Sequence, residues 1–131
     1  MKKKGLLDSY ALLAYLKREK GYEKVKSLLS SDDTLMLIND INLGETFYIL
    51  ARERGIEQAE YFMDVIFPSL PIKNITNTLI DVLEAARIKS EYSISYADCF
   101  AAATAMREDA SIVTGDPEFK KLGEKVSMVW I

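Results

Sequence analysis

Residues 95–116, SYADCFAAATAMREDASIVTGD, constrain the fold more than any other stretch of this chain. Five alanines in the first half predict a helix with little side-chain bulk, and Ser95 is placed to cap it. Ile112-Val113 is the centre of a short apolar strand, which is typical of a buried parallel strand. Because a helix of small residues packs closely on a sheet, Asp98 in its first turn is expected near the sheet edge where Asp116 follows the strand.

The composition excludes several chemistries. The 131 residues include no histidine and one cysteine, Cys99, so His-based zinc sites, Ser-His-Asp or Cys-His catalysis and an internal disulfide are excluded. No GxGxxG or P-loop pattern occurs. Hydrophobic residues make up 49%, enough for a packed core, and no apolar run approaches the roughly 18 residues of a membrane span. We expect one domain over residues 1–131, no membrane association and, with no export signal, a reducing cytoplasmic setting.

Short apolar runs alternate with segments of helical pattern along the chain. Strands are expected at about 4–7, 34–38, 70–73, 112–113 and 126–130, and helices at about 9–17, 22–30, 42–54, 56–66, 77–89 and from 96 onward. Such alternation predicts an α/β fold, a three-layer α/β/α sandwich around a mostly parallel sheet of four to five short strands with about six helices. In the helix at 77–89, the side chains expected to face the core are those of Leu79, Val82, Leu83 and Ala86.

Four acidic residues fall where strands end or helices begin. Asp8 and Asp116 follow two expected strands, and Glu45 and Asp98 lie in the first turns of helices that begin at the same edge. Ligands of parallel sheets bind outside the carboxyl ends of the strands, at the switch point in strand order. The sequence therefore predicts that all four acids lie on one rim.

Each acid also has a purely structural explanation. Asp8 and Asp116 are suitable N-caps, while Glu45 and Asp98 would complete capping boxes that begin at Asn42 and Ser95. Taken together, however, like charges about 5 Å apart repel by roughly 3 kcal/mol per pair at an effective dielectric constant near 20. Such a rim needs protonation or a bound cation.

An oxygen-only ligand set suits Mg²⁺ or Mn²⁺, with one or two ions in the site. Such an ion activates water and neutralises the oxygens of a phosphodiester. We therefore predict phosphodiester hydrolysis, with catalytic and metal-binding roles for Asp8, Glu45, Asp98 and Asp116. The hydroxyls of Ser9 and Thr114 would orient a water or a carboxylate at the same rim.

The net charge of −3 does not by itself indicate a nucleic-acid ligand, but basic residues occur in clusters. The best candidates for phosphate contacts are Lys17, Arg18, Lys24 and Arg52, although a solvated surface is the alternative interpretation for any single cluster.

Four blocks of the chain resemble the motifs of PIN-domain ribonucleases, particularly the VapC-like toxins: LLDSYALLAYL (6–16), NLGETFYIL (42–50), SYADCFAAATA (95–105) and IVTGDPEF (112–119). Their order and spacing match along essentially the whole chain. The resemblance implies a PIN-like fold, metal-dependent RNA cleavage by the four acids, and supporting roles for the hydroxyls of Ser9 and Thr114.

The same resemblance implies a homodimer and a small antitoxin whose segment enters the acidic groove. The departures from the family pattern are mild. Gly44 and Cys99 stand where alanine is usual, and Gly115 stands where asparagine is common. None of the three removes a candidate ligand.

Several functions remain open from the sequence. The chain would act as the toxin of a toxin–antitoxin pair, as a PIN nuclease of RNA processing, or as a non-catalytic PIN-like binding module whose acids serve as caps. A phospho-acceptor receiver domain is disfavoured because its third strand would lead into Asn74-Ile75-Thr76 instead of an acceptor aspartate, and because no lysine follows the last strand.

Overall fold

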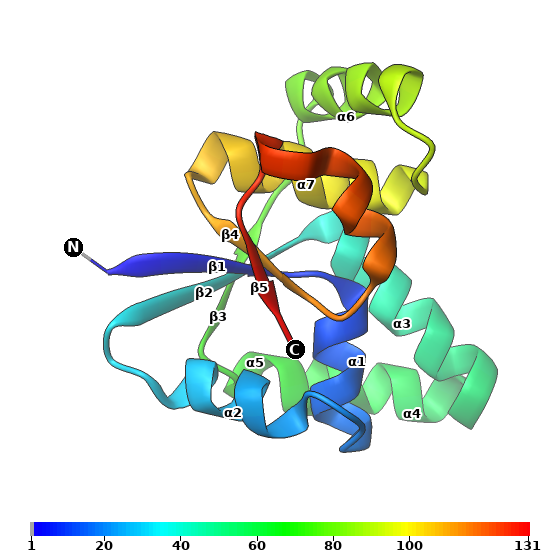
Figure 1. The fold of residues 1–131 in the computed structure, drawn as a ribbon. Helices are drawn as coiled ribbons and strands as arrows, with labels where there is room; N and C mark the ends of the chain where they lie inside the picture. The colour runs from blue at the N-terminus through cyan, green and yellow to red at the C-terminus, as the bar shows by residue number, and fades with distance from the viewer. Residues whose placement is uncertain (1) are drawn as a thin grey trace.

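The computed structural model describes residues 2–131 and has one five-stranded sheet between layers of helices (Figure 1). All neighbouring strands are parallel, in the order β3-β2-β1-β4-β5. The strands are β1 (Lys3–Leu7), β2 (Thr34–Asn39), β3 (Ile72–Ile75), β4 (Ser111–Thr114) and β5 (Met128–Trp130). The predicted α/β fold is confirmed, and within residues 2–131 the sheet has five strands and no antiparallel pair.

Seven α-helices connect and cover these strands. They are α1 (Ser9–Lys17), α2 (Tyr22–Ser30), α3 (Asp40–Arg54), α4 (Ile56–Tyr61), α5 (Phe67–Ser69), α6 (Leu79–Glu91) and α7 (Tyr96–Glu108). In Figure 1, α1 and α2 lie on one side of the sheet and α7 on the other, with α6 outside α7. Within residues 2–131, no helix combines the length and the apolar character needed to cross a membrane.

Side chains alternate between the two layers along each central strand, as pleating requires. Leu6 of β1 packs in the cluster that contains α7, whereas the next residue, Leu7, packs against α1 and α2. Ile112 and Val113 of β4 divide in the same way. Both faces of the central strands are therefore buried, which explains why the sequence shows short unbroken apolar runs there.

The segment predicted as one helix over 56–66 differs in the structure. After α4 it forms a π-helical turn over Phe62–Ile66 and then the short helix α5. Pro68 lies in the first turn of α5, where proline is tolerated because the backbone N–H groups of this turn have no partner within the helix. A 3₁₀ helix over Pro117–Lys125 has no counterpart in the sequence-based prediction.

Helix α6 presents only part of the predicted face to the core, since Val82 packs against the core whereas Leu79 and Leu83 do not. Thr78 caps it and forms a capping box with Asp81, so the helix begins at Leu79. Leu79 is 71% exposed and Leu83 is 48% exposed, while Asp81 and Ala85 are buried. The prediction that both leucines face the core was wrong, because the ion pair between Asp81 and Arg107 of α7 joins the two helices through a polar contact.

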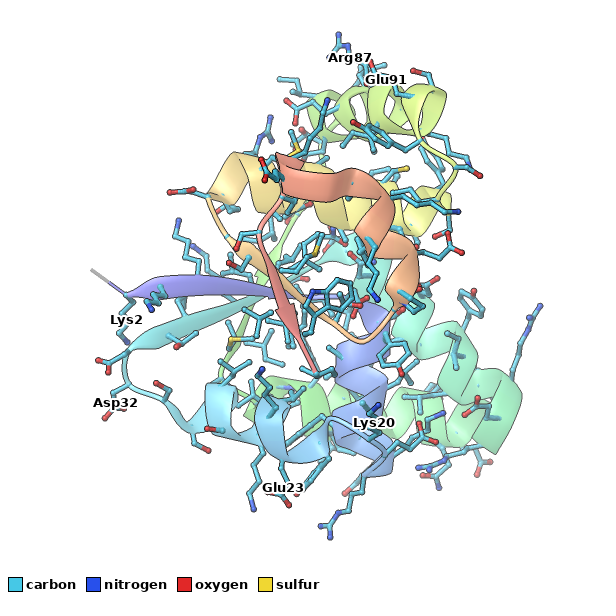
Figure 2. The ribbon with its side chains drawn as sticks, viewed as in Figure 1. Lys2, Lys20, Glu23, Asp32, Arg87 and Glu91 are labelled. Carbon is cyan, nitrogen blue, oxygen red and sulfur yellow. The ribbon has the colours of Figure 1, made fainter. Side chains whose placement is uncertain are left out.

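The outward face of α6 also carries charged side chains. Figure 2 shows Arg87 on the outer side of α6, whereas Glu91 pairs with Lys125 at 3.9 Å. This helix therefore combines exposed apolar and charged residues on its outer side.

The strand order reverses direction at β1, which has β2 on one side and β4 on the other. Asp8 directly follows the carboxyl end of β1, and Gly115-Asp116 directly follows the carboxyl end of β4. The backbone N–H of Asp8 donates to the carbonyl of Val113 at 3.4 Å, which joins the ends of the two strands. This is the switch point at which α/β sheets bind ligands.

Candidate functional site

Asp8 and Thr114 are joined at the switch point. Asp8 caps α1, since its Oδ1 accepts from the backbone N–H of Ala11 at 2.8 Å. The hydroxyl of Thr114 donates to Asp8 Oδ2 at 2.5 Å and accepts from the backbone N–H of Asp116 at 2.9 Å. One buried hydroxyl therefore connects the acids that follow β1 and β4.

Glu45 and Asp98 come from α3 and α7. The hydroxyl of Ser9 donates to the carboxylate of Glu45, which ties α3 to the start of α1. Ser95 caps α7, as predicted, and accepts from the backbone N–H of Asp98 at 3.1 Å. The predicted capping box from Asn42 to Glu45 is wrong, because the helix begins one turn earlier with Asn39 as its cap.

Asn39 also holds α3 against α7. Its side-chain amide donates to the carbonyl of Phe100 at 3.2 Å and to the hydroxyl of Thr104 at 2.9 Å. Its side-chain oxygen accepts from the backbone N–H of Asn42 at 2.7 Å. Asn39 and Asn42 are completely buried, so this amide contact fixes the two helices that carry Glu45 and Asp98.

The four predicted acids line one pocket of about 340 Å³. Ser9 and Tyr10 line the same pocket, whereas Thr114 lies buried behind it. A fifth acid, Glu118, also lines it and was missed by the sequence reasoning. Its position two residues after Asp116, in the first turn that follows this N-cap, was the available signal.

Burial and the repulsion of neighbouring charges shift Asp8 and Asp98 toward the protonated form. Burial raises the pKa of Asp8 to about 7, aided by the charges of Asp98 and Asp116 and opposed by the hydrogen bonds from Thr114 and Ala11. Burial also raises the pKa of Asp98 to about 6, with the charge of Asp116 as the next contribution. Asp8 is 2% exposed and Asp98 is 8% exposed.

No lysine or arginine of residues 2–131 lies within ion-pair distance of the four predicted acids. Lys121 pairs with the fifth acid, Glu118, at 2.7 Å, but within residues 2–131 the charge of the four predicted acids has no neutralising side chain. Only a proton or a cation from outside the chain removes this charge.

The donor set of the pocket suits a hard divalent cation in charge and in ligand type. As the side chains stand, no three acidic side chains among residues 2–131 form a ready-made metal cluster. Two of the carboxylates are engaged, Asp8 by Thr114 and Glu45 by Ser9. Carboxylates would therefore have to turn toward a shared ion.

The predicted basic residues lie outside the acidic pocket. Lys17 pairs with Glu53 at 3.0 Å and lines a hollow beside the pocket. Arg18 lies 5.6 Å from the ring centre of Tyr22, and Arg52 lies 5.5 Å from that of Tyr48.

Lys24 donates to the carbonyl of Trp130 at 2.8 Å, which ties α2 to β5. Roles in RNA binding for Lys17, Arg18, Lys24 and Arg52 stay predictions.

Comparison with known proteins agrees with this architecture. The sequence profile of the PIN domain matches residues 5–125. A comparison with curated protein sequences finds no match.

Several solved structures share the fold. Mycobacterium tuberculosis VapC20, described as a sarcin-ricin loop cleaving toxin, is 19% identical with a TM-score of 0.78 over 97% of this chain and 99% of its own. VapBC2 from Rickettsia felis, bound to a promoter DNA fragment, is 19% identical with a TM-score of 0.77 over 98% of each chain. DNA-bound VapBC from Salmonella typhimurium is 17% identical with a TM-score of 0.75 over 98% of each chain. Because the profile match spans nearly the whole chain, this chain belongs to the PIN-domain family.

Proposed function

We propose that the chain is a metal-dependent endoribonuclease and the toxin of a toxin–antitoxin pair, acting as a single domain over residues 1–131. The observation that carries this proposal is the pocket at the switch point, where Asp8 and Asp98 are buried among other acids with no basic side chain in contact. An RNA substrate implies that it acts in the cytoplasm.

Asp8, Glu45, Asp98 and Asp116 would hold one or two Mg²⁺ or Mn²⁺ ions. A bound ion would neutralise the phosphodiester oxygens and lower the pKa of an attacking water. Thr114 would hold Asp8 in place through its hydroxyl, and Ser9 would do the same for Glu45. Below neutral pH, protonation of Asp8 and Asp98 would remove the charge that the cation needs.

The test is cleavage of a single-stranded RNA oligonucleotide in Mn²⁺ or Mg²⁺ compared with EDTA. We expect cleavage only with the metal, and at least a 100-fold lower rate for Asp98→Asn. Glu108→Gln, on the same helix but outside the pocket, is the matched control and should cut at the wild-type rate. Equal rates for Asp98→Asn and wild type in nuclease-free preparations would exclude the proposal and favour a non-catalytic binding module.

An antitoxin is the proposed protein partner. Support comes from solved structures of the same fold that are described as a toxin–antitoxin complex, from Klebsiella pneumoniae, and as a member of a toxin–antitoxin family, VapBC-5 from Mycobacterium tuberculosis. Mixing the chain with the product of a neighbouring small reading frame should stop RNA cleavage at a one-to-one ratio. Continued cleavage, together with a precursor RNA that is trimmed at one site, would favour the alternative role in RNA processing.

A homodimer is the proposed assembly. Exposed apolar side chains on α6, those of Leu79, Ile80 and Leu83, give it a candidate interface because contiguous apolar patches mark contact surfaces. Sedimentation of Leu83→Asp should show a monomer at concentrations where the wild type is dimeric. Substitution of the exposed Val65 by aspartate, on the segment after α4, is the control.

A further inference from the structure

Tyr10 stands at the mouth of the acidic pocket. It lies in the first turn of α1, two residues after Asp8, and its residue surface is 43% exposed. Its side chain lines the acidic pocket and also a second hollow, about 470 Å³ in volume, that contains Lys17 and Lys20 together with Glu19 and Glu53. Leu13 and Ile49 are likewise shared by the two hollows, so Tyr10 lies on a continuous track from acids to lysines.

The Tyr10 ring is seated on the backbone of the site. A Cβ added to Gly115 would lie 2.3 Å from Cε1 and 2.8 Å from Cζ of the ring, which is closer than atoms can approach. Gly115 separates Thr114 from Asp116, so the ring occupies the space that any side chain at this position would need. The glycine, which stands where asparagine is common among PIN domains, thus makes room for an aromatic side chain.

We propose that Tyr10 stacks on a nucleobase adjacent to the scissile phosphodiester of single-stranded RNA, an inference that rests on the proposed nuclease function. Aromatic rings bind unpaired bases through their faces, with little dependence on base identity. The contact with Gly115 fixes the ring before the substrate arrives, which reduces the entropy lost on binding. The acids beside the ring would position the phosphodiester through the metal.

Lys20 supplies a charge for the next phosphate along the track. Lys20 is exposed beyond the C-terminal end of α1 (Figure 2). It forms no ion pair with any of residues 2–131. Lys17 differs, because Glu53 and Glu19 already neutralise it at 3.0 and 3.4 Å. An exposed ring between an acidic metal pocket and an unpaired lysine favours a nucleotide over an apolar peptide as the occupant.

The decisive experiment pairs Tyr10 variants with RNA oligonucleotides that carry or lack one base beside the cleavage site. We expect Tyr10→Leu to raise KM for the complete oligonucleotide about 10-fold, with kcat changed less than threefold. The KM of the wild type for the abasic oligonucleotide should be higher than its KM for the complete one by a similar factor. For Tyr10→Leu, the two oligonucleotides should have the same KM. Tyr10→Phe should behave as wild type, and so should Tyr61→Ala, which removes a similarly exposed tyrosine on α4.

A double-mutant cycle tests the packing beneath the ring. Gly115→Ala should lower the melting temperature and raise KM in the Tyr10 background, because the new Cβ displaces the ring. In the Tyr10→Ala background, where that space is empty, Gly115→Ala should do neither. Equal effects in both backgrounds would overturn the inference.

Binding to the non-cleaving Asp98→Asn variant separates this inference from the proposed function. Fluorescence anisotropy of a labelled oligonucleotide should show weaker binding when Tyr10→Leu is added. A wild-type protein that does not cut RNA would overturn the nuclease proposal, whatever the binding result. If the protein cuts RNA with the same KM in wild type and Tyr10→Leu, only the role of Tyr10 is overturned. The same conclusion holds if Tyr10→Leu weakens binding of a protein partner but leaves RNA binding unchanged.

Discussion

Asp8 and Asp81 are similarly hidden from solvent but differ in what surrounds their charge. Asp8 is 2% exposed and Asp81 is 4% exposed. Both lie at a helix N-terminus and accept backbone hydrogen bonds, Asp8 from Ala11 and Asp81 from Thr78. Asp81 in addition forms an ion pair with Arg107, whereas the charged neighbours that act on Asp8 are Asp98 and Asp116.

The comparison separates a structural acid from a functional one. A buried carboxylate with a cationic partner inside the chain contributes to the fold and gains nothing from an added ion. A buried carboxylate among other acids favours the neutral form until a cation enters. Position at a cap and degree of burial do not distinguish the two cases, but the sign of the nearest charge does.

The largest expected effect is on the stability of the Asp81 region. Arg107→Met would leave the Asp81 carboxylate buried without its partner, and we expect the free energy of unfolding to fall by about 3 kcal/mol. Asp8→Asn, measured in EDTA at pH 8, should lower the free energy of unfolding by less than about 1 kcal/mol or raise it, because asparagine also caps helices and carries no charge. Urea denaturation measures both.

The same two variants should have opposite effects on RNA cleavage. Arg107→Met should cut at the wild-type rate at temperatures where it is folded, and Asp8→Asn should not cut. A cleavage defect in Arg107→Met under those conditions would break the distinction between the two regions.

The second prediction concerns pH. The pKa values of Asp8 and Asp98 are raised from 3.8 to about 7 and about 6, so the folded state holds protons that the unfolded state releases. Their stabilising contribution is complete below pH 4 and is lost as pH rises through 6 and 7. Without metal, the free energy of unfolding of the wild type relative to Asp8→Asn should therefore fall by about 2 kcal/mol between pH 5 and pH 8.

Saturating Mn²⁺ should remove this decline, because a bound cation stabilises the ionised acids of the folded state. Thermal or urea unfolding at several pH values, with Mn²⁺ and with EDTA, provides the measurement. A pH profile of wild type parallel to that of Asp8→Asn in EDTA would contradict the assignment of Asp8 as an uncompensated acid.

The smallest expected effect concerns the hydroxyl between Asp8 and Asp116. Thr114→Val keeps the shape of the side chain but removes the donor to Asp8 and the acceptor for the Asp116 backbone, at a cost of about 1 kcal/mol in stability. It should also raise the pKa of Asp8 further, because the hydrogen bond from Thr114 lowers it. Thr114→Ser is the control and should retain both properties, measured by unfolding and by the pH dependence of cleavage.

Much of the site was predictable because its signals are local. Asp8, Ser95 and Asp116 act as caps through contacts with residues two or three positions away, and the apolar runs of the central strands indicate burial on both faces. Parallel strands then bring their carboxyl ends to one edge whatever the loops contain. Placing Asp8 and Asp116 at the same edge of the sheet therefore required only the order of strands and helices.

The failures came where a partner lies far along the chain. The buried face of α6 depends on Arg107, 26 positions after Asp81, and the leucine spacing alone favoured another face. The ion pair between Lys17 and Glu53, 36 positions apart, is likewise invisible to local patterns, while the role of Lys17 in RNA binding stays a prediction. Local periodicity reports which residues share a face, but not which charge that face will meet.

The sequence by itself determined the order of the elements, the helix caps and the acids at the strand ends, since these follow from backbone geometry over a few residues. Tertiary structure alone decided that the strand order reverses between β1 and β4, that Asp81 is neutralised while Asp8 is not, and that the Tyr10 ring fills the space above Gly115. Those outcomes depend on packing between segments up to about a hundred residues apart. Close packing admits only one such arrangement, and no short-range pattern specifies it.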